Sequence, residues 1–155
     1  KFDHKVLVEE AIQGREIETA VLGGDRPEAS LPGEIVTHSR HGFYSYDSKY
    51  IDPEGAQLRA PVKLEAALEK QVRELAARVF KTLCCQGMGR VDMFLTPDGR
   101  LLVNEINTIP GFTGISMYPK LWEVTGLQTP KLLDRLIEIA LEGHRQQAAL
   151  QHNRV

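Results

Sequence analysis

The sequence predicts an α+β fold in which an antiparallel β-sheet is flanked by helices. Three observations support this prediction: a strong hairpin signal at Asp98-Gly99, two segments with a helical spacing of apolar residues, and short strand-like segments near the start of the chain. The chain has 155 residues, of which 42% are apolar and 26% are charged, and this is enough to bury the core of one domain.

Charge and hydropathy exclude two classes of partner. The formal net charge of −2 gives no electrostatic reason to expect binding to nucleic acid or to an anionic membrane. The longest apolar runs fall far short of the roughly 20 residues that cross a bilayer, and no secretory signal opens the chain, so we expect a cytoplasmic protein. The first residues run into a strand pattern without an initiator methionine, which indicates a fragment of a longer protein.

The N-terminal part of the chain has the pattern of three strands. Residues 6–12 and 16–22 form the first two, separated by Gln13-Gly14-Arg15, and residues 33–38 form the third. Residues 39–60 are rich in Tyr, Asp, Ser and Gly and lack periodicity. We expect this long irregular segment to be a functional lid or a disordered loop.

Two longer helices are predicted by apolar residues at three- and four-residue spacing. The first covers residues 64–83, and the second begins near Pro130 and ends at Gly143. A short helical stretch at residues 119–124 precedes the second. We therefore expect one domain over residues 1–143 and a flexible polar tail over residues 144–155.

The hairpin is the strongest local signal in the chain. Residues 89–95 and 100–107 flank Asp98-Gly99, a dipeptide that suits a two-residue type I′ turn. With that turn, the numbers of facing residues sum to 197, so Asp92 faces Glu105 and Arg90 faces Asn107. These four side chains are therefore expected on one face of the hairpin.

Two carboxylates that face each other repel, unless a cation lies between them. Two carboxylates and an amide oxygen suit Mg²⁺, which completes its octahedron with phosphate oxygens and water. A zinc site is disfavoured because no Cys/His pair has zinc-ligand spacing. The hairpin alone leaves a second interpretation open, in which the strands simply expose charges to solvent.

Two segments together resemble the signature of a known family. Residues 89–92 (Gly-Arg-Val-Asp) and 104–113 (Asn-Glu-Ile-Asn-Thr-Ile-Pro-Gly-Phe-Thr) resemble the D-alanine–D-alanine ligases of the ATP-grasp superfamily. The resemblance extends to residues 5–10, 14–16, 43–50 and 116–119, and it covers nearly all of the chain apart from the tail. It implies that the chain is the C-terminal lobe of an ATP-grasp enzyme.

The resemblance implies a reaction and a set of catalytic groups. ATP phosphorylates the carboxylate of one D-alanine, the amine of a second attacks the acyl phosphate, and phosphate leaves. Asp92, Glu105 and Asn107 would hold two Mg²⁺ or Mn²⁺ ions. Arg90 and the amide of Gly111 would stabilise the developing oxyanion. In addition, Ser116 and the amide of Met117 would bind the carboxylate of the second D-alanine.

The resemblance also implies a nucleotide site and a lid. Residues 9–12 match the segment whose backbone pairs with adenine, Glu16 matches the carboxylate that binds the ribose, and Phe94 would pack on the adenine. Lys49 would approach the phosphates, and Tyr50 would hydrogen-bond near the substrate and favour D-alanine over D-lactate. A surface acid, a core aromatic and an exposed tyrosine are the plainer interpretations of Glu16, Phe94 and Tyr50. The predicted nucleotide-binding residues are Glu9, Glu10, Ile12, Glu16, Lys49, Phe94 and Asn104.

The resemblance finally implies partners and leaves two alternatives. The N-terminal domains of the same ligase, which carry the glycine-rich loop and further substrate residues, are needed for activity, so this chain alone is expected to be inactive. The full-length protein is expected to be a homodimer. The alternatives are another ATP-grasp carboxylate–amine ligase and a non-catalytic nucleotide-binding module.

Overall fold

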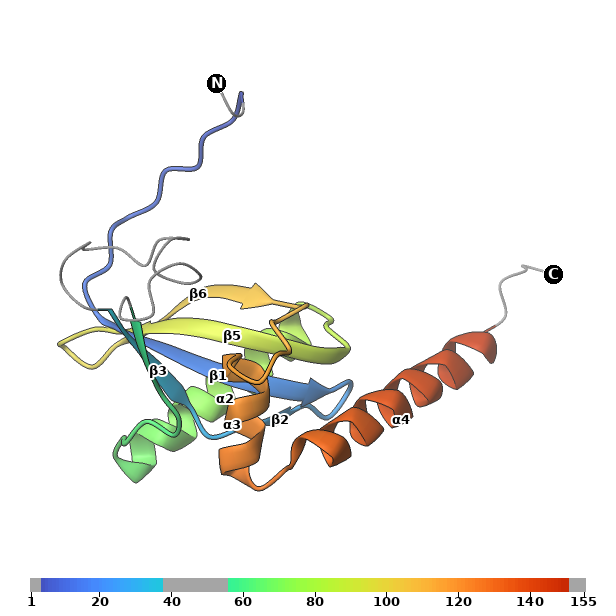
Figure 1. Ribbon diagram of the computed structural model, residues 1–155. Coiled ribbons are helices and arrows are strands. Elements are labelled where there is room, and N and C mark those ends of the chain that lie inside the picture. Colours follow the sequence, from blue (N-terminus) through green and yellow to red (C-terminus); the bar gives the residue numbers. More distant parts are fainter. Residues whose placement is uncertain (1–3, 38–55, 151–155) are drawn as a thin grey trace.

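The computed structural model describes residues 4–37 and 56–150. It confirms the α+β class: one sheet, with every pair of neighbouring strands antiparallel, has the order β4-β3-β1-β5-β6, and β2 pairs with β1 (Figure 1). The elements in chain order are β1 (Arg15–Gly23), β2 (Glu28–Ala29), β3 (Gly33–Thr37), β4 (Ala56–Arg59), α2 (Ala66–Thr82), β5 (Gly87–Leu95), β6 (Leu101–Asn107), α3 (Met117–Thr125) and α4 (Thr129–Ala148).

The helices cover both faces of the sheet and create two apolar clusters. Strand β1 shows the division, because successive side chains of a strand point to opposite faces. Ile17 and Val21 pack against α2, whereas Ala20 and Leu22 pack against α3 and the start of α4. The α2 cluster also contains Val62, Val72, Ala76, Phe80, Val91, Met93 and Leu95, and the α3 cluster contains Ile35, Met117, Tyr118, Leu121, Trp122 and Leu132.

The predicted helix over residues 64–83 is confirmed as α2. Its buried residues, Val72, Ala76 and Phe80, recur every four positions and so lie on one helical face. The helix ends where Cys84 adopts a left-handed backbone conformation with a φ of 53°. This turn leads the chain into β5, the strand that carries most of the predicted site.

The predicted strand at residues 6–12 is wrong. Residues 5–13 form neither helix nor strand, and the segment extends away from the sheet (Figure 1). Val6, Leu7 and Val8 are 83%, 80% and 87% exposed, although they are apolar. A run of apolar residues forms a strand only where a partner strand and an apolar surface lie beside it. The described part of the chain places neither next to residues 6–8.

Two other boundaries differ from the predictions. β4 lies inside the segment predicted to be irregular up to residue 60, because Leu58 pairs with Ile35 of β3, a contact that local sequence does not reveal. Helix α4 does not end at Gly143 but continues to Ala148. On either side of the glycine, Glu142 forms an ion pair with Arg145 at 3.1 Å and accepts a hydrogen bond from Gln146 at 3.0 Å. Such side-chain pairs offset part of the roughly 1 kcal/mol of stability that a glycine costs in a helix.

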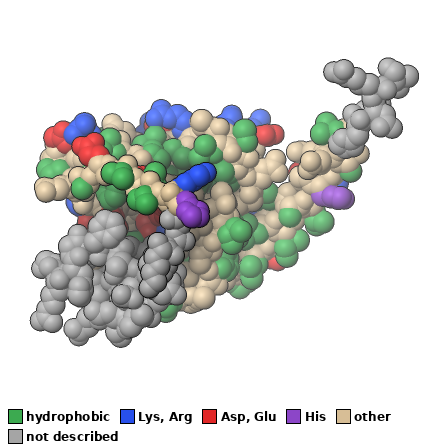
Figure 2. All heavy atoms as spheres, turned by 90° about the horizontal axis from the view of Figure 1, so that it is seen from above, with side chains coloured by type: hydrophobic (Ala, Val, Ile, Leu, Met, Phe, Trp, Pro, Cys, Tyr) green, Lys and Arg blue, Asp and Glu red, His purple; other side chains and the backbone are tan. Residues whose placement is uncertain are grey.

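Helix α4 projects beyond the sheet (Figure 1) and carries apolar side chains along its exposed surface (Figure 2). Leu133, Ile137 and Leu141 are 46%, 58% and 57% exposed. In residues 4–37 and 56–150, no helix has the length and apolar character needed to span a bilayer.

Candidate functional site

The turn of the hairpin differs from the predicted type I′ turn. Thr96 and Arg100 pair through their backbones, with Thr96 N donating to Arg100 O at 3.0 Å, so the loop contains three residues rather than two. Gly99 has a φ of +83°, but Asp98 does not have the positive φ that a type I′ turn requires. Pro97 explains the difference, because its fixed φ favours the first central position of a type I turn.

A second irregularity restores the predicted register at the site. The longer turn gives pairs whose numbers sum to 196, from Leu95 opposite Leu101 to Met93 opposite Val103. The register then shifts by one residue, and Asp92 faces Glu105. Asn104 is the extra residue of this β-bulge. The predicted pairings of Asp92 with Glu105 and of Arg90 with Asn107 are therefore confirmed, although the turn that led to them was wrong.

Strand β1 adds a third carboxylate to this face. Glu18 pairs with Asp92 across β1 and β5, and Asp92 pairs with Glu105 across β5 and β6. The three carboxylates thus form a row across neighbouring strands, which we call the acidic row. Arg90 lies one pleat along from Asp92, on the same face. Sequence reasoning missed Glu18, and its signal is the spacing of two residues from Glu16, which places both glutamates on one face of the strand.

Arg90 holds the acidic row together. Its Nε donates to Asp92 Oδ1 and its Nη2 donates to Asp92 Oδ2, both at 2.7 Å. Nε also lies 3.3 Å from Glu18 Oε2. The side chains of Arg90 and Glu18 are 12% and 4% exposed, so this charge cluster is largely desolvated. Burial lowers the pKa of Arg90, but the hydrogen bond to Asp92 and the charges of Glu18, Asp92 and Glu105 outweigh burial and raise this pKa overall.

The donor set fits a hard divalent cation. Glu105 is exposed, and Asn107 Oδ1 accepts a hydrogen bond from the Ile109 amide at 3.1 Å, which leaves its second lone pair for a ligand. Within the described residues, no three His, Cys, Asp or Glu side chains converge as a complete cation site. Asp92 and Glu105 offer two carboxylates and Asn107 offers an amide oxygen. Such a set suits an ion such as Mg²⁺, which takes few protein carboxylates and completes its shell with other oxygens.

Glu16 and Phe94 lie opposite each other on the same face as the acidic row. Glu16 pairs with Phe94, two residues along each strand from the Glu18–Asp92 pair. Both side chains are partly exposed. The sheet thus brings a carboxylate and an aromatic ring next to the predicted cation ligands. These are the two residues that the sequence analysis predicted to bind the ribose and to pack on the adenine.

The loop after β6 brings Gly111 and Ser116 together. A Cβ at Gly111 would lie only 2.9 Å from Ser116 Oγ, so a side chain at this position would displace the Ser116 hydroxyl. Ser116 Oγ accepts a hydrogen bond from the Thr113 amide at 3.0 Å and lies at the N-cap of α3. The amide of Met117 is thus in the first turn of a helix, where backbone N–H groups lack partners within the helix and favour anions.

The loop is anchored to the core by aromatic packing. The rings of Phe112 and Tyr118 are 5.9 Å apart between centroids, and the Tyr118 hydroxyl donates to the Val21 carbonyl at 3.1 Å. Burial raises the pKa of Tyr118, so this hydroxyl stays protonated and remains a donor. The position of the loop is thereby tied to β1.

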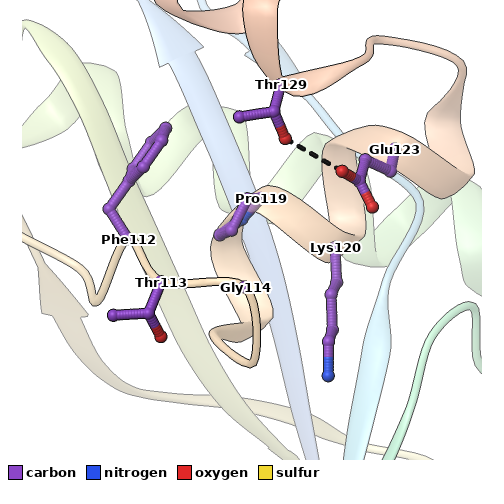
Figure 3. A pocket seen from close by; sticks show the side chains of 7 residues that line it. All are labelled: Phe112, Thr113, Gly114, Pro119, Lys120, Glu123 and Thr129. Carbon is purple, nitrogen blue, oxygen red and sulfur yellow. Dashed lines mark hydrogen bonds between the residues drawn. The ribbon is translucent and has the colours of Figure 1, made fainter.

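A small pocket lies beside the loop and does not contain the acidic row. Its volume is about 100 Å³, and Thr129 Oγ1 donates to Glu123 Oε1 at 2.9 Å on its wall (Figure 3). Pockets for nucleotides and other small molecules are roughly 300–1,000 Å³. Neither this pocket nor the larger cavity beside Arg15 and Glu34 is lined by the acidic row in the described part of the chain.

The remaining predicted nucleotide-binding and lid residues lie apart from the acidic row or outside the described residues. Glu9, Glu10 and Ile12 lie in the extended segment before β1, and Asn104 is an exposed bulge residue. Lys49 and Tyr50 lie outside the described residues.

Known proteins similar to this chain in sequence and in fold include D-alanine–D-alanine ligases. The D-alanine–D-alanine ligase of Coxiella burnetii is 55% identical over 150 residues, which are 97% of this chain and 40% of that protein. The solved structure of the D-alanine–D-alanine ligase from Coxiella burnetii aligns with a TM-score of 0.77 and 48% identity, over 90% of this chain and 35% of that chain. A D-alanine–D-alanine ligase from Bacillus anthracis, solved in complex with ATP, aligns with a TM-score of 0.72 and 29% identity, over 90% and 43% of the two chains.

The chain spans about 40% of the length of the curated relatives that it matches. A family model described as D-ala D-ala ligase C-terminus matches residues 1–138, which include every described strand and the first half of α4. The chain therefore belongs to the family of D-alanine–D-alanine ligase C-terminal domains.

Proposed function

We propose that the full-length protein joins two D-alanines to D-alanyl-D-alanine with ATP, for the synthesis of peptidoglycan precursors. The observation that carries this proposal is the pairing of Asp92 with Glu105 beside Arg90 and Asn107, on one face of a sheet in this family. In the proposed reaction, ATP phosphorylates the carboxylate of one D-alanine. The amine of the second D-alanine attacks the acyl phosphate, and phosphate leaves from a tetrahedral intermediate.

Asp92, Glu105 and Asn107 are the proposed cation ligands, and two Mg²⁺ or Mn²⁺ ions would neutralise charge on the nucleotide phosphates when bound. Asp92 and Glu105 face each other across the β5–β6 ladder. Opposed carboxylates repel in the absence of a positive charge, so their arrangement supports a cation there. Glu105 is the more exposed of the two and is therefore the more accessible ligand.

Arg90 and Gly111 are the proposed oxyanion stabilisers. The guanidinium of Arg90 is held by two hydrogen bonds to Asp92, so a fixed positive charge is available where negative charge grows. Ser116 and the amide of Met117 would bind the carboxylate of the second D-alanine. Their place at the start of α3 supports this role, because the unpaired amides of a first helical turn attract carboxylates.

The nucleotide would lie along the same face of the sheet. Glu16 would accept hydrogen bonds from the ribose hydroxyls and Phe94 would pack on adenine, and their direct pairing supports a shared ligand. Residues 9–12 would contact adenine through their backbone, and Asn104 would lie near the phosphates. Lys49 and Tyr50, from the proposed lid, would approach the phosphates and the second substrate.

We propose that further domains of the full-length protein close over the sheet face. The exposure of Glu105 supports this, because catalysis requires that ATP and both amino acids be held together, an effect worth roughly 7–11 kcal/mol. The isolated chain would therefore be inactive. Because the reaction consumes ATP, we place it in the cytoplasm, and we propose a homodimer, which light scattering of the full-length protein would test.

Phosphate release by the full-length protein with ATP, Mg²⁺ and D-alanine tests the function. We expect release that depends on D-alanine and is abolished in Glu105→Gln. Glu123→Gln is the matched control, since Glu123 is an exposed glutamate on α3 that bonds to Thr129 rather than to the acidic row.

Other results would favour the alternatives. Release that depends on another acid would indicate a different carboxylate–amine ligase of the ATP-grasp type. Absence of Mg²⁺-dependent ATP binding would indicate a non-catalytic module.

A further inference from the structure

Glu18 has no part in the proposed reaction, yet it is a buried carboxylate beside the proposed cation ligands. The residue is 3% exposed and lies at the centre of the sheet, on β1. Its Oε2 lies 3.3 Å from Nε of Arg90. A buried carboxylate is costly unless a partner compensates its charge, so a role for Glu18 is expected to involve Arg90.

The geometry of Asp92 presents a conflict that Glu18 can resolve. Both carboxylate oxygens of Asp92 accept hydrogen bonds from Arg90 at 2.7 Å. A divalent cation such as Mg²⁺ binds a carboxylate oxygen at about 2.0–2.1 Å. Such a cation and the guanidinium repel each other, so they cannot both occupy the front of this carboxylate at full strength. Each Asp92 oxygen keeps a second lone pair for the cation, so the conflict is one of charge: the bound cation weakens the attraction between Asp92 and the Arg90 guanidinium.

We propose that Glu18 is a positioning residue that accepts Arg90 when a divalent cation displaces it from Asp92. This inference rests on the proposed cation site at Asp92, Glu105 and Asn107. Nε of Arg90 already lies between the two carboxylates, at 2.7 Å from Asp92 Oδ1 and 3.3 Å from Glu18 Oε2. A small rotation of the guanidinium thus exchanges one partner for the other, and Arg90 stays on the sheet face where the proposed oxyanion develops.

The charge balance of the cluster supports this exchange. Three carboxylates and one guanidinium carry a net charge of −2, which a divalent cation neutralises. An arginine side chain keeps its charge in proteins, so the guanidinium exchanges partners rather than losing a proton. Without Glu18, the guanidinium of Arg90 would lose its contact with Asp92 and find no second carboxylate to accept it. Because this guanidinium is largely desolvated, its loss of a partner would oppose metal binding.

Binding of Mn²⁺ to the full-length protein, measured from the loss of the free-ion electron paramagnetic resonance signal, tests the proposal without any turnover. We expect Glu18→Gln to weaken Mn²⁺ binding by roughly tenfold or more, since a hydrogen bond to a charged group exceeds the ~1.4 kcal/mol that a factor of ten represents. In an Arg90→Met background no exchange is needed, and Glu18→Gln should change the Mn²⁺ affinity by less than about threefold, a small fraction of the single-background effect.

Glu34→Gln is the matched control. Glu34 is also a buried glutamate in an ion pair, with Arg15 at 2.6 Å, but it lies on β3 and outside the acidic row. Its substitution should leave Mn²⁺ affinity unchanged. If Glu18→Gln weakens binding equally with and without Arg90, Glu18 acts on the cation by its own charge, and the exchange is refuted.

Glu105→Gln separates the two levels of the argument. If it binds Mn²⁺ like the wild type, the proposed cation site itself is wrong. If it abolishes binding while Glu18→Gln has no effect, only the inference about Glu18 fails. Should Arg90→Met not fold, as judged by its melting curve, Arg90→Lys replaces it. A lysine cannot hold both Asp92 oxygens in a fixed fork, so the effect of Glu18→Gln should again shrink.

Discussion

Gly89 offers a sharp test of how the core supports the strand that carries the site. A Cβ at this position would lie 3.1 Å from Cδ2 and Cε2 of Phe80 and 3.3 Å from Cδ1 of Ile106. Phe80 is fully buried on α2, and Gly89 directly precedes Arg90 on β5. We therefore expect that a methyl group at position 89 would crowd the ring of Phe80, which would have to shift to accommodate it.

The magnitude follows from two opposing terms. Overpacking of this kind costs roughly 1–3 kcal/mol of stability. Replacement of a glycine by alanine also stabilises the fold by about 0.4–1 kcal/mol, because it lowers the conformational entropy of the unfolded chain. Gly89→Ala should therefore destabilise the fold by about 1–2 kcal/mol. Phe80→Ala alone should cost about 3–5 kcal/mol, because it removes a fully buried ring. In the Phe80→Ala background the crowding disappears, and Gly89→Ala should become neutral or slightly stabilising.

Urea unfolding of the four proteins of this double-mutant cycle measures the coupling. Trp122 is the only tryptophan of the chain and is 3% exposed, so its fluorescence reports unfolding. We expect a coupling free energy of about 1–3 kcal/mol between the two positions, with m-values unchanged.

Gly24→Ala is the control, because a Cβ at Gly24 would meet nothing within 4 Å. It should be neutral or slightly stabilising, and by the same amount in both backgrounds. An equal cost of Gly89→Ala with and without the Phe80 ring would refute the reasoning, because the cost would then arise from the backbone of β5 rather than from packing against α2.

Three further predictions concern other parts of the structure. The hydrogen bond from Arg15 lowers the pKa of Glu34. The stability that this carboxylate contributes is therefore complete above its unfolded pKa near 4.5 and is lost as pH falls through the lowered folded value. The difference in urea midpoint between wild type and Glu34→Gln should accordingly shrink between pH 7 and acid pH. Gly99→Ala should lower stability by about 1–2 kcal/mol in the same assay, because φ is positive at this turn residue, and Gly99→Asn should cost less. Ser116→Ala should raise the KM for D-alanine roughly tenfold in the full-length protein, with Thr129→Ala as control; an unchanged KM would remove Ser116 from the substrate site.

The predictions that depended on local periodicity and on a single turn were the most successful. Helix α2 and the β5–β6 hairpin lie where apolar spacing and Asp98-Gly99 indicated. The pairing of Asp92 with Glu105 was right for an incomplete reason, because a loop that is one residue longer and the bulge at Asn104 compensate each other. Turn type and bulges depend on side-chain bonds and strand twist, which residue spacing alone does not encode.

Partner choice over long sequence separations was not available from the sequence. The apolar residues near the start of segment 6–12 indicated a strand, but a strand forms only beside a partner, and Val6, Leu7 and Val8 are exposed instead. The strand β4 was missed for the converse reason, because its pairing with β3 supplies most of what makes it a strand.

By itself the sequence determined which residues alternate, which recur with helical spacing, and which four side chains the hairpin brings to one face. The tertiary structure alone decided that β1 lies beside β5, and therefore that Glu18 faces Asp92 and contacts Arg90. The physical reason is the range of the interactions. A hairpin register is set by a turn and a bulge within one short stretch of chain, whereas the neighbour of a central strand is selected by the burial of both sheet faces, against α2 on one side and α3 on the other.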